Sequence, residues 1–109
     1  MKKSLILLFF IFIAELFSEN YKIDNITFEI EGKTKQNYLL TKFPINKEQI
    51  FSSENDFNFF VEDYKTKLSN LRAFEQIEIE KQLINEKEDI KYVNLIIKLK
   101  EGFSFFALP

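Results

Sequence analysis

Few residues of this chain could take part in chemistry, because its 109 residues include neither histidine nor cysteine. The usual general base at neutral pH is therefore missing, as are imidazole and thiolate metal ligands. Nucleophilic catalysis would need a serine–lysine or carboxylate arrangement. The serines beyond the N-terminal stretch lie in no context that suggests one: Ser52, Ser53, Ser69 and Ser104. We expect no enzymatic activity, no metal site, no cofactor and no small-molecule substrate.

Two short motifs resemble ligand-binding loops. Gly32, Lys33 and Thr34 match the end of a phosphate-binding P-loop, but that motif needs another glycine five positions before Gly32, where Thr27 stands. The acidic run NEKED at 85–89 lacks the glycine and the ligand spacing of a calcium loop. We interpret the first motif as a strand-to-helix turn and the second as a solvated hairpin turn.

The N-terminus has the pattern of a secretory signal peptide. Two lysines precede an apolar run from Leu5 to Ala14, and Glu15 ends it. This run is shorter than the roughly 20 residues of a membrane-spanning helix, so we expect a signal peptide over 1–18, cleaved near Ser18. An uncleaved membrane anchor is the alternative. The absence of cysteine excludes disulfides and lipidation at a signal-peptide cysteine.

The remaining part of the chain is slightly acidic. Without residues 1–18 it has 13 basic and 16 acidic residues, a net charge of −3. DNA- and RNA-binding domains carry a basic face, so we expect no nucleic-acid partner. About 90 residues suffice for one hydrophobic core, which predicts a single domain over 19–102.

Hydrophobic periodicity predicts a strand and two helices in the first part of this domain. Residues 21–32 alternate as a half-buried strand, with three apolar side chains on one face: Ile26, Phe28 and Ile30. A short helix over 33–43 is expected next, with Thr34 as N-cap and Pro44 as its stop. After a connector over 45–53, Ser53 caps a long helix. Its apolar stripe consists of Phe57, Phe60, Val61, Tyr64, Leu68 and Leu71, with Phe59 off the stripe.

The last part of the chain predicts a β-hairpin. Strands are expected over 74–84 and 90–101, joined by the polar turn 85–89. Ile77, Ile79, Val93, Leu95, Ile97 and Leu99 would face inward, while Glu78, Glu80, Lys98 and Lys100 would face outward and pair across the strands. The predicted fold class is therefore α+β, with a three-stranded sheet covered on one face by two helices.

Several stretches of the sequence resemble the POTRA (polypeptide-transport-associated) domain of the BamA-like outer-membrane assembly family. They are ITFEIEGKTK, the sequence L-x-N-L-R-x-F at Leu68, Asn70, Leu71, Arg72 and Phe74, and YVNLIIKLKEG near the end. The resemblance implies a β-α-α-β-β domain over 19–102. Residues 103–109, with Phe103, Phe105 and Phe106, resemble a linker to a β-barrel that this chain lacks. Barrel insertase activity is not carried over.

The resemblance also implies a function and a site. POTRA domains lie in the periplasm at the outer membrane, where clients or partner subunits can add a strand to an exposed sheet edge. We expect a non-enzymatic binding module for outer-membrane protein assembly or polypeptide transport, associated with the membrane only through partners. These would be unfolded outer-membrane polypeptides or an assembly subunit. The expected edge comprises Phe74, Glu75, Gln76, Ile77, Glu78, Ile79, Glu80, Lys81 and Gln82.

The alternative is a truncated remnant, or a small secreted α+β structural protein, with no client. Either way, Leu68 and Leu71 should complete the core stripe, and Phe74 should fill the helix–sheet junction. On this interpretation Phe74→Ala would cost about 3–5 kcal/mol.

Overall fold

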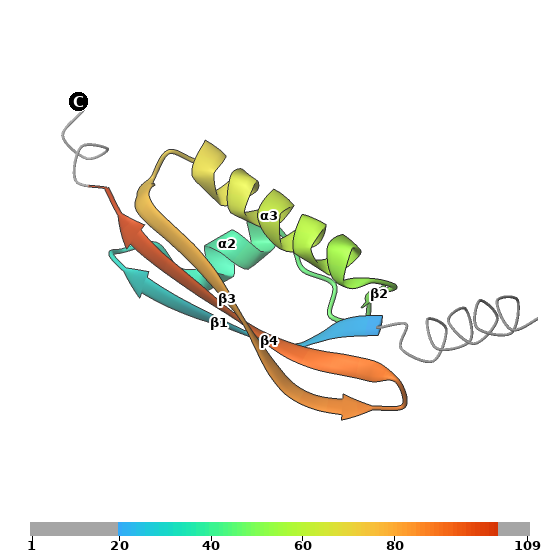
Figure 1. Ribbon diagram of the computed structural model, residues 1–109. Coiled ribbons are helices and arrows are strands. Elements are labelled where there is room, and N and C mark those ends of the chain that lie inside the picture. The colour runs from blue at the N-terminus through green and yellow to red at the C-terminus, as the bar shows by residue number, and fades with distance from the viewer. Residues whose placement is uncertain (1–19, 103–109) are drawn as a thin grey trace, which may run out of the picture.

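The computed structural model describes residues 20–102 and has an α+β fold with two helices and a four-stranded sheet (Figure 1). The elements in chain order are β1 (Asn20–Glu31), α2 (Gln36–Lys42), β2 (Ile50–Phe51), α3 (Glu54–Asn70), β3 (Phe74–Lys87) and β4 (Ile90–Glu101). The signal peptide predicted for residues 1–18 and the tail 103–109 lie outside the described residues.

The sheet has one strand more than the sequence predicted. Its order is β2-β1-β4-β3, with β1 and β4 parallel at the centre and β3 antiparallel to β4. The additional strand, β2, lies in the predicted connector and pairs Phe51 with Tyr21 and Ile50 with Lys22. Two residues are too few to show an alternating pattern, so periodicity could not reveal this strand.

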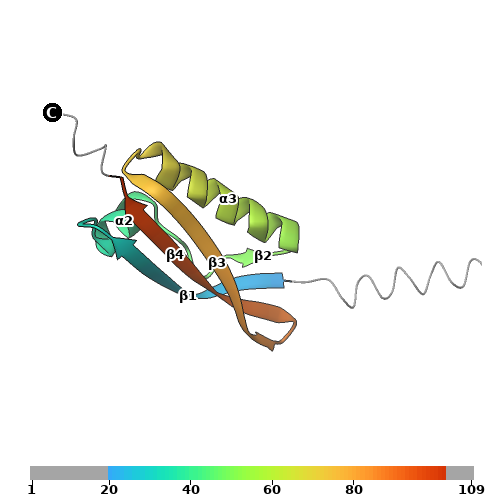
Figure 2. The same cartoon turned by 60° about the vertical axis from the view of Figure 1, so that its left-hand side comes forward.

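Both helices lie on one face of the sheet, as Figures 1 and 2 show. Two clusters of side chains fill the space between the layers. In the first, Phe57 and Val61 of α3 pack with Ile23, Phe51, Val93 and Leu95. In the second, Tyr64 and Leu68 pack with Leu39, Ile97 and Leu99. The predicted stripe of α3 and the predicted inward face of β4 therefore form the core, with Phe60 and Leu71 only partly buried.

A β-bulge divides β1 into two halves. Ile23 pairs with Val93 and Asn25 with Asn94, so Asp24 is the additional residue. Because a one-residue insertion exchanges the two faces of a strand, inward positions change from odd-numbered to even-numbered residues here. Tyr21 and Ile23 face the helices before the bulge, and Ile26 does so after it. The bulge thus keeps the whole strand packed against one helical layer.

The change from helix to strand at Leu-Arg-Ala-Phe depends on a left-handed residue. The Leu71 N–H bonds the Leu68 carbonyl at 3.2 Å and the Arg72 N–H bonds the Ser69 carbonyl at 3.0 Å. Arg72 then has φ +55°, a conformation that more often belongs to glycine. Phe74 follows as a partly buried residue against the second cluster, so the junction is less enclosed than the sequence suggested.

The N-cap of α3 was predicted correctly and that of α2 was not. The Ser53 hydroxyl accepts a hydrogen bond from the Asp56 N–H at 3.1 Å. Helix α2 begins later than expected, after Lys35, and no side chain caps it. Thr34 instead donates hydrogen bonds to a carboxylate at the end of β4, because the chain turns there against Glu101.

The hairpin turn is shorter than predicted. Strand β3 continues through 85–87, and only Glu88 and Asp89 form the turn. Their φ angles are +55° and +64°, as expected for a two-residue hairpin turn whose twist matches the flanking strands. The five-residue turn 85–89 was wrong because both faces of β3 are exposed there, so its polar residues show no alternation.

Candidate functional site: the outer edge of β3

All nine residues of the predicted edge lie on one strand at one border of the sheet. Phe74 to Gln82 belong to β3, which pairs with β4 along its length. Within residues 20–102 no strand pairs with its other side. Alternate residues of such an edge direct their N–H and C=O groups away from the sheet. The long twisted strand visible in Figures 1 and 2 therefore presents unpaired main-chain groups along this border of the sheet.

The two faces of this edge differ in chemistry. On the helix side, Ile77 and Ile79 are partly buried and pack against the core clusters. On the opposite side, Glu78 and Glu80 are exposed to solvent. A strand added here would place one row of its side chains beside isoleucines and the other beside carboxylates.

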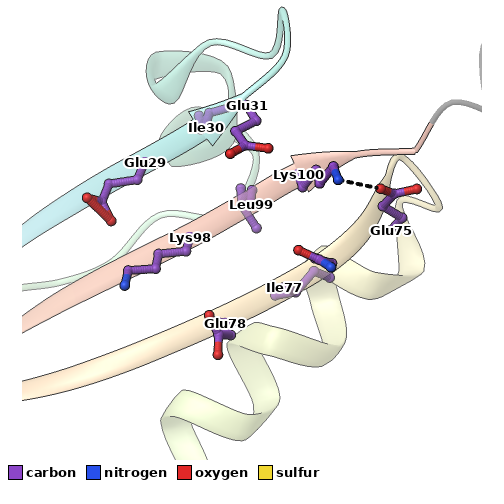
Figure 3. Close-up of a pocket in the computed structure, with 10 residues that line it drawn as sticks. Glu29, Ile30, Glu31, Glu75, Ile77, Glu78, Lys98, Leu99 and Lys100 are labelled. Carbon is purple, nitrogen blue, oxygen red and sulfur yellow. Dashed lines mark ion pairs between the residues drawn. The ribbon is translucent and has the colours of Figure 1, made fainter.

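A shallow hollow lies on the uncovered face of the sheet (Figure 3). Lys98 and Lys100 lie along its floor on the central strand β4, and glutamates lie on the strands to both sides. The lining residues are Glu29, Ile30, Glu31, Glu75, Gln76, Ile77, Glu78, Lys98, Leu99 and Lys100.

Ion pairs join β3 to β4 across this face, as the sequence predicted, but the second carboxylate is that of Glu75 and not that of Glu78. Lys98 Nζ lies 2.8 Å from Glu80 Oε1, and Lys100 Nζ lies 3.2 Å from Glu75 Oε1. The hydrogen bond to Glu80, with the attraction of that carboxylate, raises the pKa of Lys98 above its ordinary value. Lys98 therefore stays protonated at neutral pH. Because these pairs are solvent-exposed, they fix the position of side chains more than they stabilise the fold.

Lys81 is a charged residue on the helix side of the edge, where Ile77 and Ile79 are apolar. Its ammonium group donates a hydrogen bond to Asn58 of α3. This contact joins the edge strand to the helix near the point where the hairpin extends past the helical layer (Figure 1). Beyond it, Leu83 and Ile84 are 59% and 48% exposed, so the apolar character of β3 continues onto the uncovered part of the hairpin.

The structure has a second open edge, on β1, that the sequence pattern did not predict. Strand β2 pairs only with Tyr21 and Lys22 of β1. From Asn25 to Glu31, β1 pairs with β4 on one side, and no other described strand pairs with it. This edge is open because β2 is only two residues long and ends before it covers the rest of β1. A strand of two residues leaves no periodic pattern in the sequence.

Thr34 of the P-loop-like motif and the serines Ser52 and Ser53 form hydrogen bonds within the fold. The Thr34 N–H and hydroxyl each bond Glu101 Oε1 at 2.6 Å, so they are occupied and not directed at a phosphate. Ser52 donates a hydrogen bond to Asp56 at 3.1 Å, and Ser53 caps α3. Within residues 20–102, no cluster of three or more acidic side chains could hold a metal ion.

No protein-family model matches the chain, and a comparison with curated proteins found no match to its sequence. In the part of the chain that the structure describes, neither helix is long and apolar enough to cross a membrane.

Proposed function

We propose that this chain is a non-enzymatic binding module of the POTRA type. It would act in the periplasm at the outer membrane, in protein assembly or polypeptide transport. In this proposal, the outer edge of β3 takes up an extended strand of an unfolded outer-membrane polypeptide or of an assembly subunit. The observation that carries the proposal is that β3 pairs along its whole length with β4 and is open on its other side within the described residues.

Two further features support the proposal. The order β1-α2-α3-β3-β4 agrees with that of POTRA domains, with the two-residue β2 as an addition. Both helices lie on one face, so they leave the other face and the border at β3 accessible to a client. Main-chain hydrogen bonds would provide affinity, and alternate side chains would provide selectivity.

The test is an NMR titration of the exported domain with an unfolded peptide from an outer-membrane barrel strand. Backbone amide signals of Glu75 to Gln82 should shift, because their surroundings change when a strand pairs with the edge. Signals of α2 and of the second open edge, Asn25 to Glu31, should stay fixed.

The matched controls are two forms of the same peptide, N-methylated at alternate residues in opposite phase. Only one phase of amides faces β3, so one form should lose binding and the other should retain it. Equal binding of both forms would show that main-chain pairing is not the mode of recognition. No binding of the unmodified peptide would favour a structural protein without a client.

A further inference from the structure

The charged side chains of the uncovered face form rows across the strands. Lys98 on β4 is in register with Glu29 on β1 and with Glu78 on β3. The row therefore alternates between negative, positive and negative charge from one strand to the next. A strand added beyond β3 would extend this row, and its side chain opposite Glu78 would be most favourable as a cation.

Glu78 forms no ion pair within residues 20–102, although Lys98, its register partner on β4, attracts its carboxylate. The lysines of β4 form their ion pairs with Glu80 and Glu75 instead. Within residues 20–102, no lysine or arginine nitrogen lies within ion-pair distance of Glu78. Glu78 is exposed at the border of the sheet, and an arriving strand would meet its carboxylate first.

The other face of the edge selects for apolar residues. Ile77 and Ile79 are partly covered by the core clusters, and side chains of an added strand on that side would cover them further. The occupant that fits both faces is therefore a strand in which apolar residues alternate with lysine or arginine.

The same charges disfavour a second copy of this chain as the occupant. Pairing β3 of one copy with the open part of β1 of another would bring Glu78 and Glu80 beside Glu29 and Glu31. Like charges directly opposite each other destabilise a pair of strands. The acidic borders thus oppose edge-to-edge association of the protein with itself.

We propose that β3 selects clients by charge and takes up amphipathic strands with lysine or arginine at every second position. This inference rests on the proposed function, because it assumes strand addition at β3.

The test uses two synthetic peptides of about ten residues, the length of a long strand. One alternates valine with lysine and the other alternates valine with glutamate. Affinities are measured by fluorescence anisotropy at low and high salt, and the bound region is mapped by NMR. The lysine peptide should bind at least about tenfold more tightly at low salt, since the side chains opposite Glu78 and Glu80 change from attracted to repelled. High salt should reduce this difference.

Two charge-reversal variants test whether Glu78 is the residue that distinguishes the lysine peptide from the glutamate peptide. Glu78→Lys should weaken binding of the lysine peptide about tenfold and strengthen that of the glutamate peptide. Glu29→Lys is the matched control: it makes the same change in net charge, in the same row, on the opposite side of Lys98. It should leave both affinities within about twofold at about 0.15 M salt, because an added strand would lie three strand spacings, about 14 Å, from Glu29 and so beyond the Debye length.

The outcomes separate the charge selectivity from the proposed function. Equal affinities with amide shifts in β3 would overturn the charge selectivity and leave strand addition intact. Tighter binding of the lysine peptide with shifts confined to other elements would contradict strand addition at β3, and the selectivity with it. Equal effects of Glu78→Lys and Glu29→Lys would overturn the role of Glu78.

Discussion

Replacing Gly32 by alanine should destabilise the domain for two reasons, one in the backbone conformation and one in a steric contact. Gly32 has φ +144°, a conformation that residues with a side chain rarely adopt. An added Cβ would also overlap Cδ of Glu101. That carboxylate accepts two hydrogen bonds from Thr34, each 2.6 Å long. The variant therefore has to strain its backbone and displace the group that joins the end of β4 to the turn after β1.

The magnitude follows mainly from the backbone. A residue with a side chain held in such a conformation costs about 1–3 kcal/mol, and loss of the Glu101 contacts adds to that cost. A domain of this size has a total stability of only about 4–12 kcal/mol. Each 1 kcal/mol should lower the Tm by about 4–8 °C, so the change is large enough to measure without difficulty.

The assay is urea and thermal unfolding followed by circular dichroism, with Gly102→Ala as the matched control. At Gly102 an added Cβ would lie 3.6 Å from its nearest neighbour, an ordinary contact. Its N–H would still bond the Ala73 carbonyl. The control should change stability by less than about 1 kcal/mol. Adding Glu101→Ala to Gly32→Ala removes the steric contact but not the backbone strain. Equal unfolding of the Gly32 and Gly102 variants would show that neither the φ angle of Gly32 nor its closeness to Glu101 matters for stability.

Three further predictions concern the core and two titrating groups. Leu68→Ala removes a fully buried side chain and should cost about 2–5 kcal/mol in urea unfolding. Phe59→Ala on the same helix should cost less than about 0.5 kcal/mol, because Phe59 is 75% exposed; similar costs would show that the stripe of α3 is misassigned. Hydrogen bonds from Thr34 lower the pKa of Glu101 from its ordinary 4.5. The resulting stabilisation should be complete above pH 4.5 and lost as the pH falls through the folded-state pKa. Unfolding of the wild type and of Glu101→Gln should therefore differ most at neutral pH and converge in acid; a constant difference would contradict this. Burial raises the pKa of Tyr64 from 10.0 to about 12, so its neutral form stabilises the fold below pH 10, and this contribution declines as the pH rises toward 12. Tyr64→Phe should show less alkaline loss of stability than the wild type, and an equal loss would refute the assignment.

The sequence predicted those elements whose hydrophobic pattern repeats over several turns or residue pairs. Helix α3 has one apolar stripe and a serine cap, and the buried positions of β4 alternate from Val93 to Leu99. Most of their burial was therefore predictable from the pattern, although Phe60 and Leu71 are only partly buried. The fold class α+β followed from the same patterns.

The structure differs from the sequence predictions where tertiary contacts override local patterns. Thr34 has the chemistry of an N-cap, but Glu101, 67 residues later, takes its hydrogen bonds. The bulge at Asp24 and the two-residue β2 leave no periodic signal. The polar end of β3 resembles a turn because neither of its faces is covered by a helix.

The candidate site was predicted only in part. The resemblance to POTRA domains indicated β3 as the edge, and the structure places this strand at the border of the sheet. The second open edge on β1 and the row through Glu29, Lys98 and Glu78 depend on strand order and register. Neither can be read from one strand alone.

Amide-resolved hydrogen exchange of the domain, with and without a saturating client peptide, would show directly whether a strand adds to the outer edge of β3. Outward N–H groups of an edge strand exchange readily until another strand accepts their hydrogen bonds. Strand addition predicts that alternate amides between Phe74 and Gln82 become protected, while those of the β1 edge from Asn25 to Glu31 do not. Protection that leaves β3 unchanged while the peptide is bound would contradict the claim.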